Sequence, residues 1–222
     1  MKSKTNLLTW ALAFVLICLP LATFTSCGDD NQSMNLTLNA GETHDIGNGS
    51  DWKSANPFVA SVSGSTIEAN CVGNTTVSSG SSNIKVTVKA THFDFNDPCL
   101  QWGASKSSVK SYMSKYNLLD EESTSLGYDG SGKTYMYNYL FENGKLNASS
   151  ILVKSYYSSD IAAYLKERYY PIHVSEDDVI YMIDAKQETF ALVSVYTSGA
   201  SVYVMGLYGQ YTGEKVYEAP KM

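Results

Sequence analysis

Hydrophobic residues change their spacing twice after residue 105, each time from the pattern of a helix to that of strands. Two sets of residues follow the spacing of one apolar helix face: Val109, Tyr112, Met113 and Tyr116, and then Ile161, Tyr164, Leu165 and Tyr169. We expect Ser105 or Ser107 to cap the first helix. Ser158 or Ser159 should cap the second helix, and Pro171 should end it.

Three strand-like stretches follow each predicted helix. They cover residues 122–128, 134–142 and 147–156, and then residues 178–185, 189–197 and 201–211. Asn143-Gly144 and Ser198-Gly199 join the last two stretches of each set, as hairpin turns do. Residues 105–215 are therefore predicted to form an α+β domain of two helix-plus-three-strand meander repeats. Its antiparallel sheet should have about six strands, with both helices on one face.

Residues 34–90 have a different pattern, with short β-branched runs separated by Ser, Thr, Asn and Gly. All 17 tyrosines lie between Tyr112 and Tyr217, so the composition changes near residue 100. This pattern predicts two domains, an all-β sandwich over 34–90 and the α+β domain, joined by a linker at 91–104. We expect aromatic residues of the linker to pack between or beneath the domains: Phe93, Phe95 and Trp102.

The pattern W-x-S-x-N-x-x-V-A-x-V runs from Trp52 to Val62. With its flanking strands, it resembles bacterial immunoglobulin-like domains of group 2 (BIG2). The resemblance implies a sandwich in which Trp52 fills the space between two sheets and Asn56-Pro57 makes a turn. Such domains serve as rigid spacers or adhesive modules, so the resemblance implies no catalysis.

The N-terminus is typical of a secretion signal, because Lys2 and Lys4 precede an apolar run over residues 7–21. Phe24-Thr25-Ser26-Cys27 resembles the bacterial lipobox, which implies a signal peptide over 1–26 and a lipid on Cys27. The alternative is plain secretion with cleavage nearby. Acyl chains would tether the protein to a membrane rather than make it span one.

Asp29 and Asp30 follow the cysteine in an acidic tether over 27–33. They resemble the export signal of Bacteroidetes lipoproteins, which implies the outer face of the outer membrane; the periplasmic leaflet is the alternative. The chain has 16 basic and 22 acidic residues, and this acidic balance disfavours nucleic acid as a partner. We expect a monomer that binds no nucleotide and no other cofactor, with a tail at 216–222.

Residues 127–134, GYDGSGKT, match the pattern of a phosphate-binding loop. A phosphate loop must lead into a helix, whereas Tyr135, Tyr137 and Tyr139 follow here at the spacing of a strand. The segment is therefore predicted to be a hairpin turn. His44, His92 and His173 lack the spacing of metal ligands, so no metal site and no catalytic residue are assigned.

Cys71 and Cys99 are the remaining cysteines of the mature chain. They form either a disulfide or two buried free thiols, because the sequence does not show whether the sulfurs meet.

Tyrosines are the candidate ligand-binding residues: Tyr135, Tyr137, Tyr139, Tyr203 and Tyr211. If the helices cover the other face of the sheet, these rings form an aromatic surface that suits a glycan or a protein. If the helices cover this face, the tyrosines are core residues. The helix-and-meander layout also resembles β-lactamase-inhibitor-like folds, which are binding proteins.

The sequence thus predicts a cell-surface lipoprotein with a non-catalytic binding role, presented on an immunoglobulin-like spacer. One alternative is a hydrolase that uses carboxylates of the C-terminal domain. Another is a structural component of a surface assembly, which would pair through an exposed strand edge at residues 201–211.

Overall fold

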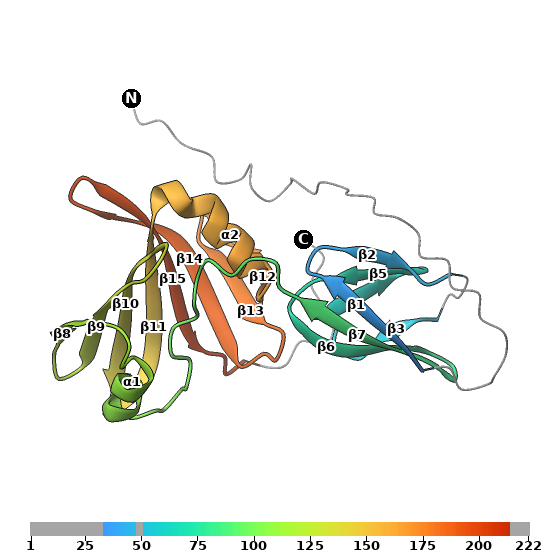
Figure 1. Cartoon of the computed structure of the whole chain (residues 1–222), viewed down its shortest axis with the longest axis horizontal. Coiled ribbons are helices and arrows are strands. Elements are labelled where there is room, and N and C mark those ends of the chain that lie inside the picture. Colours follow the sequence, from blue (N-terminus) through green and yellow to red (C-terminus); the bar gives the residue numbers. More distant parts are fainter. Residues whose placement is uncertain (1–32, 48–50, 214–222) are drawn as a thin grey trace. The chain divides into compact units, whose positions relative to one another are not determined.

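The computed structural model describes residues 33–47 and 51–213 (Figure 1). The predicted signal peptide, Cys27, Asp29, Asp30 and the tail at 216–222 lie outside the described residues. From Ser33 to Gly213 the described residues belong to one compact unit. This part of the chain is mostly β, with several sheets and two α-helices. Neither of these helices is long and apolar enough to cross a membrane.

The first seven strands form two sheets. The strands are β1 (Ser33–Asn39), β2 (Thr43–Asp45), β3 (Lys53–Ser54), β4 (Ala60–Ser63), β5 (Thr66–Ala69), β6 (Gly73–Ser79) and β7 (Ser82–Lys89). One sheet has the order β1-β7-β6-β3 and the other β2-β5-β4. A single buried cluster takes residues from both sheets, including Val77 and Val86 from the first and Ile67 from the second. Trp52 packs against this cluster.

Asn56 makes the turn that the sequence predicts. Its side-chain oxygen accepts a hydrogen bond from the backbone N–H of Phe58 at 3.1 Å. Its carbonyl accepts one from Val59 N, also at 3.1 Å. The turn brings Val59 into the buried cluster.

The remaining eight strands form one antiparallel sheet, in the order β12-β13-β14-β15-β11-β10-β9-β8. They are β8 (Leu118–Glu121), β9 (Ser125–Asp129), β10 (Thr134–Glu142), β11 (Lys145–Lys154), β12 (Tyr169–Val174), β13 (Ile180–Asp184), β14 (Thr189–Ser198) and β15 (Ser201–Gln210). The expected number of about six strands is therefore too small. β15 lies between β14 and β11, so the expectation of a free strand edge at residues 201–211 is wrong.

The two strands missed by the sequence analysis are the edge strands β8 and β12. All four residues of β8 are exposed, so the strand has no apolar alternation to reveal it. β12 contains Pro171, which we expected to end a helix. An edge strand tolerates proline because one side of the strand has no partner, and the pairing with β13 shifts between Pro171 and His173.

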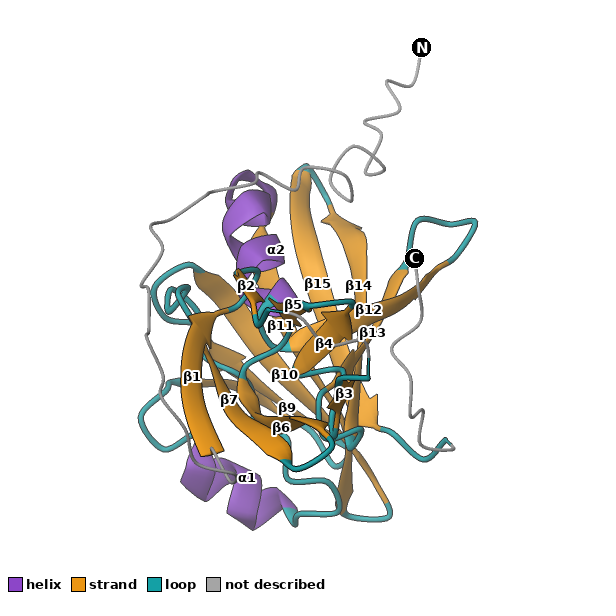
Figure 2. Cartoon of the chain, turned by 90° about the vertical axis from the view of Figure 1, so that its right-hand side faces the viewer, coloured by secondary structure: helices purple, strands orange, loops and turns teal. Residues whose placement is uncertain are grey.

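The two helices are α1 (Lys106–Tyr112) and α2 (Ser158–Lys166), drawn in purple in Figure 2. Ser105 caps α1 as predicted, because its side chain accepts a hydrogen bond from Ser108 N. The caps expected for α2 are wrong, because a 3₁₀ turn (Ser155–Tyr157) leads into the helix and Tyr157 is the capping residue. Both helices are shorter than predicted.

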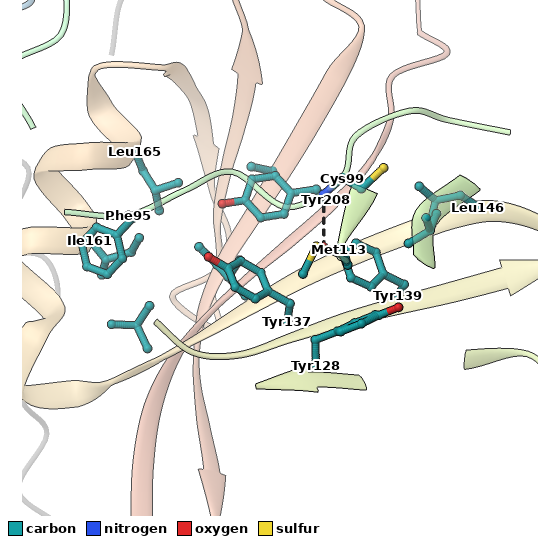
Figure 3. Close-up of a cluster of buried hydrophobic side chains, with 14 of the residues drawn as sticks. Phe95, Cys99, Met113, Tyr128, Tyr137, Tyr139, Leu146, Ile161, Leu165 and Tyr208 are labelled. Carbon is teal, nitrogen blue, oxygen red and sulfur yellow. Dashed lines mark hydrogen bonds between the residues drawn. The ribbon is translucent and has the colours of Figure 1, made fainter. Parts of the chain in front are cut away.

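Both helices pack on the same face of the eight-stranded sheet. Val109 of α1 belongs to one buried cluster with Ile161 and Leu165 of α2 and with Tyr137 and Tyr208 of the sheet. Figure 3 shows the two α2 residues and the two tyrosines of this cluster. We call this side the covered face and the opposite side the open face.

The segment at 91–104 also belongs to this core, although the sequence suggested a linker. Phe95 and Cys99 are buried in the cluster, and Trp102 packs against it. The indole N–H of Trp102 donates to the hydroxyl of Thr189 at 3.2 Å. Of the expected aromatic anchors, only Phe93 points to solvent, with 75% of its surface exposed.

Candidate functional site

Two of the five candidate tyrosines, Tyr137 and Tyr139, are core residues with 1% and 0% exposure. The hydroxyl of Tyr139 accepts from Cys99 N at 3.2 Å and donates to the sulfur of Met113 at 3.0 Å. Burial raises the pKa of Tyr137 to about 12 and raises that of Tyr139 further. The expectation that these two rings bind a ligand is corrected, because the helices cover this face.

Tyr135 lies on the open face because a β-bulge interrupts the alternation of β10. The pairing with β11 shifts between Thr134 and Met136. Thr134 and Tyr137 are therefore both buried, while Tyr135 is 42% exposed. An extra residue in one strand turns the following side chains to the other face. The period-two pattern of the tyrosines could not show this reversal.

Three tyrosines form a row across the open face, which we call the tyrosine row: Tyr135, Tyr203 and Tyr196. The ring centroids of Tyr135 and Tyr203 are 5.0 Å apart, and those of Tyr196 and Tyr203 are 6.4 Å apart. Tyr203 is buried by its neighbours, whereas Tyr196 is 43% exposed. The ammonium group of Lys154 lies 5.8 Å from the centre of the Tyr135 ring, within the range of a cation–π contact.

Tyr196 and Lys154 are not among the candidate residues predicted from the sequence. A usable signal was present for Tyr196, since the two-residue turn at Ser198-Gly199 fixes the register of the hairpin and pairs Tyr196 with Tyr203. No comparable signal exists for Lys154, because its position opposite Tyr203 depends on the pairing of β11 with β15. Tyr211 follows β15, bonds through its backbone to Glu188, and is not part of the row.

Apolar side chains continue the open face beyond the tyrosine row. Leu152 pairs with Met205 across β11 and β15, and Leu192 pairs with Leu207 across β14 and β15. Met205, Leu192 and Leu207 are partly exposed, and Leu140 on β10 is 52% exposed. This face therefore presents an apolar surface that crosses four strands.

Two carboxylates, the half-buried Asp97 and the buried Glu167, lie near Arg168 on the other side of the sheet. Burial raises the pKa of Asp97, and burial also acts to raise that of Glu167. Hydrogen bonds from Thr91 and His92 outweigh this effect and hold the pKa of Glu167 below its ordinary value. The opposite shifts resemble those of a catalytic acid and base.

The contacts of Glu167 give it a structural role. Its carboxylate accepts from the backbone N–H groups of Thr91 and His92, each at 3.0 Å, and from the Thr91 hydroxyl. His92 Nδ1 lies 2.8 Å from Oε1. The backbone carbonyl of Glu167 accepts from Val72 N at 2.7 Å. Glu167, at the end of α2, thus connects the helix to the loop before β6 and to the segment that follows β7.

The phosphate-loop motif forms the turn between the antiparallel strands β9 and β10, as the sequence predicts. Its lysine, Lys133, makes ion pairs with Asp94 at 3.0 Å and Asp160 at 2.8 Å. The positive charge of Lys133 is thus already neutralised by two carboxylates and is not available to a phosphate.

Cys71 and Cys99 are free thiols, so the structure has the second of the two predicted alternatives. Both side chains are buried, with exposures of 1% and 0%. Burial raises the pKa of Cys71 to about 12 and also raises that of Cys99. A thiol must ionise before it reacts. Both cysteines are therefore protected by their burial and by their raised pKa.

We therefore expect both cysteines to resist alkylation in the native protein. Iodoacetamide at pH 8 should label neither Cys71 nor Cys99 within an hour, and should label both after unfolding in guanidinium chloride without reductant. Peptide mass spectrometry distinguishes the two sites. Labelling that required a reductant after unfolding would show a disulfide instead.

Within residues 33–47 and 51–213, no three His, Cys, Asp or Glu side chains gather where they could hold a metal ion. Comparison of the chain with protein-family models, with curated proteins and with solved structures finds no match in any of the three.

Proposed function

We propose that this protein is a non-catalytic binding protein, and that the open face of its eight-stranded sheet binds a protein partner. The tyrosine row supports this proposal most directly. Two of its rings are more than 40% exposed on the face that the helices leave uncovered. Tyrosine is enriched where partners bind, because its ring buries a large apolar area while its hydroxyl remains able to form a hydrogen bond.

A protein suits the open face better than a glycan. The apolar surface runs from the tyrosine row along β14 and β15 through Met205, Leu192 and Leu207. Aromatic residues and Met are enriched in protein interfaces, whereas charged residues are depleted at their centres. A glycan would also need many polar groups for its hydroxyls, and Ser194 is the polar residue between these apolar side chains on β14.

Lys154 indicates one further property of the partner. Its side chain is exposed beside the tyrosine row and forms no ion pair within the described part of the chain. A carboxylate placed opposite Lys154 would gain an ion pair and fix the orientation of the partner. We therefore propose a partner with an apolar surface and an acidic group at its edge.

The wider architecture fits a tethered binding protein. We propose that lipid on Cys27 holds the chain at the outer face of the outer membrane, and that residues 34–90 are a BIG2-like spacer. We also propose that the C-terminal region is a duplicated unit. α1 is followed by β8 to β11 and α2 by β12 to β15, and the last strands of the two sets pair at the centre of the sheet.

Photo-crosslinking from the open face tests the binding proposal. A benzophenone amino acid is placed at Tyr196 or at Tyr112 of the full chain, in the cells that produce it. The two positions have matched exposures of 43% and 47%, but Tyr112 lies on α1. We expect one discrete protein adduct from position 196 and none from position 112.

The variant Lys154→Glu should remove this adduct, because the acidic group of the partner would then meet a like charge. Equal adducts from both positions, or an adduct that persists in Lys154→Glu, would contradict the proposal. A diffuse, glycosidase-sensitive adduct would show that the partner is a glycan.

A further inference from the structure

We propose that a hollow beside the β9–β10 turn is a binding site for a single neutral sugar unit. The hollow, which we call the turn pocket, has a volume of about 240 Å³. It is lined by Asn96, Lys115, Tyr116, Asn117, Asp129, Gly130 and Ser131. These residues place polar groups around one aromatic ring, and none of them belongs to the tyrosine row.

Hydrogen bonds hold the three segments of the turn pocket in place. Asp129 N donates to the carbonyl of Asn117 at 2.9 Å, and the hydroxyl of Tyr137 donates to the carbonyl of Asn96 at 3.4 Å. Gly130 N donates to the carbonyl of Tyr135 at 3.0 Å. A Cβ atom at Gly130 would lie 2.0 Å from a backbone oxygen, so the turn requires glycine there. The pocket is thus formed before a ligand arrives, which lowers the entropic cost of binding.

The polar groups of the turn pocket suit hydroxyl groups. Each side-chain amide of Asn96 and Asn117 carries two N–H donors and one oxygen acceptor, and each hydroxyl of a sugar both donates and accepts. Both asparagines are exposed, and their amides form no hydrogen bond within the described residues. They are therefore available to a ligand.

Tyr116 supplies an apolar wall for the C–H face of a sugar ring. It packs edge-on against Tyr137, with centroids 5.2 Å apart and an angle of 61° between the rings. This packing fixes the orientation of the Tyr116 ring, and part of the ring remains accessible. Small-molecule sites usually combine an apolar wall with a few polar groups at fixed positions.

Charges in the turn pocket favour a neutral ligand over a phosphate. The carboxylate of Asp129 would repel an anion, and Lys133 is paired with Asp94 and Asp160. The ammonium group of Lys115 lies 5.2 Å from the centre of the Tyr116 ring. Its positive charge offsets the negative charge of Asp129 in the same pocket. The phosphate-loop motif of the sequence therefore contributes a wall of a sugar site.

Saturation-transfer NMR on the purified full-length chain tests the proposal. The probes are the methyl glycosides of glucose, galactose, mannose and N-acetylglucosamine, with inorganic phosphate as a competitor. We expect saturation of the ring protons of at least one glycoside, with no displacement by phosphate. Asn96→Ala/Asn117→Ala should weaken this binding by about tenfold or more, because two hydrogen-bonding side chains are lost.

Asn147→Ala is the matched control, since Asn147 is exposed on β11 and does not line the turn pocket. This variant and Tyr196→Ala should bind the glycoside as the parent chain does. Absence of saturation for all four glycosides would overturn the proposal, as would equal binding by the double variant. Loss of binding in Tyr196→Ala alone would place the sugar on the open face instead.

Discussion

Replacing Tyr139 by alanine is expected to lower the free energy of unfolding by about 4 kcal/mol, in the range of large-to-small changes at buried aromatic residues. The ring is fully buried between the sheet and Met113. The variant would leave a cavity and would also remove the hydroxyl that accepts from Cys99 N. Urea denaturation followed by circular dichroism measures the change.

Tyr135→Ala is the control for this prediction, because the two tyrosines belong to the same strand. Tyr135 is exposed on the open face, so its loss should cost less than about 1 kcal/mol. The loss of unfolding free energy in Tyr139→Phe should lie between those of the two alanine variants, since phenylalanine keeps the packing and removes only the hydroxyl. If Tyr135→Ala and Tyr139→Ala destabilised the protein equally, the assignment of the two sheet faces would be wrong.

Replacing Glu167 by alanine is expected to cost about 3 kcal/mol at neutral pH, since hydrogen bonds to a charged group contribute roughly 1.5–3 kcal/mol each and water would partly replace them. Only 6% of the side chain is exposed. Its loss leaves the N–H groups of Thr91 and His92 without their acceptor. Glu142→Ala, at an exposed glutamate of β10, should change stability little.

The contribution of Glu167 should also depend on pH. Burial acts to raise the pKa of this carboxyl, but the hydrogen bonds from Thr91 and His92 hold it below the ordinary value of 4.5. A carboxyl with a lowered pKa in the folded state stabilises the protein fully above its unfolded pKa. This stability is lost as the pH falls through the pKa of the folded state.

Urea denaturation of the parent chain and Glu167→Gln from pH 7 to pH 3 measures this dependence. The difference in stability should stay constant down to about pH 5 and shrink below it. A difference that grows on acidification would mean that the folded state binds the proton more tightly, contrary to the contacts described.

The sequence predicts those parts of the fold that depend on local patterns. The bounds of β10 agree with the predicted strand. The buried residues of the helices are Val109 of α1 and Ile161, Tyr164 and Leu165 of α2, and all four lie on the predicted apolar faces. These features follow from apolar spacing within about ten residues of chain. The turn at Asn56 follows from an equally local preference of asparagine.

Features that depend on distant contacts could not be predicted. The role of Glu167 rests on Thr91 and His92, which precede it by 76 and 75 residues. β8 lacks apolar alternation because all four of its residues are exposed, and in β12 the proline at position 171 obscures the strand pattern. The bulge at Tyr135 places this tyrosine on the face opposite to Tyr137 and Tyr139, although the three alternate regularly in the sequence, so the exposed face could not be identified beforehand.

Binding at the open face is best measured as the affinity of the purified chain for the partner captured from position 196. Calorimetric titration compares Tyr196→Ala with Tyr112→Ala, two tyrosines of similar exposure on opposite faces of the sheet. We expect at least about tenfold weaker binding for Tyr196→Ala, as for a central interface tyrosine, and unchanged binding for Tyr112→Ala. Equal affinities of the two variants would show that the open face is not the binding surface.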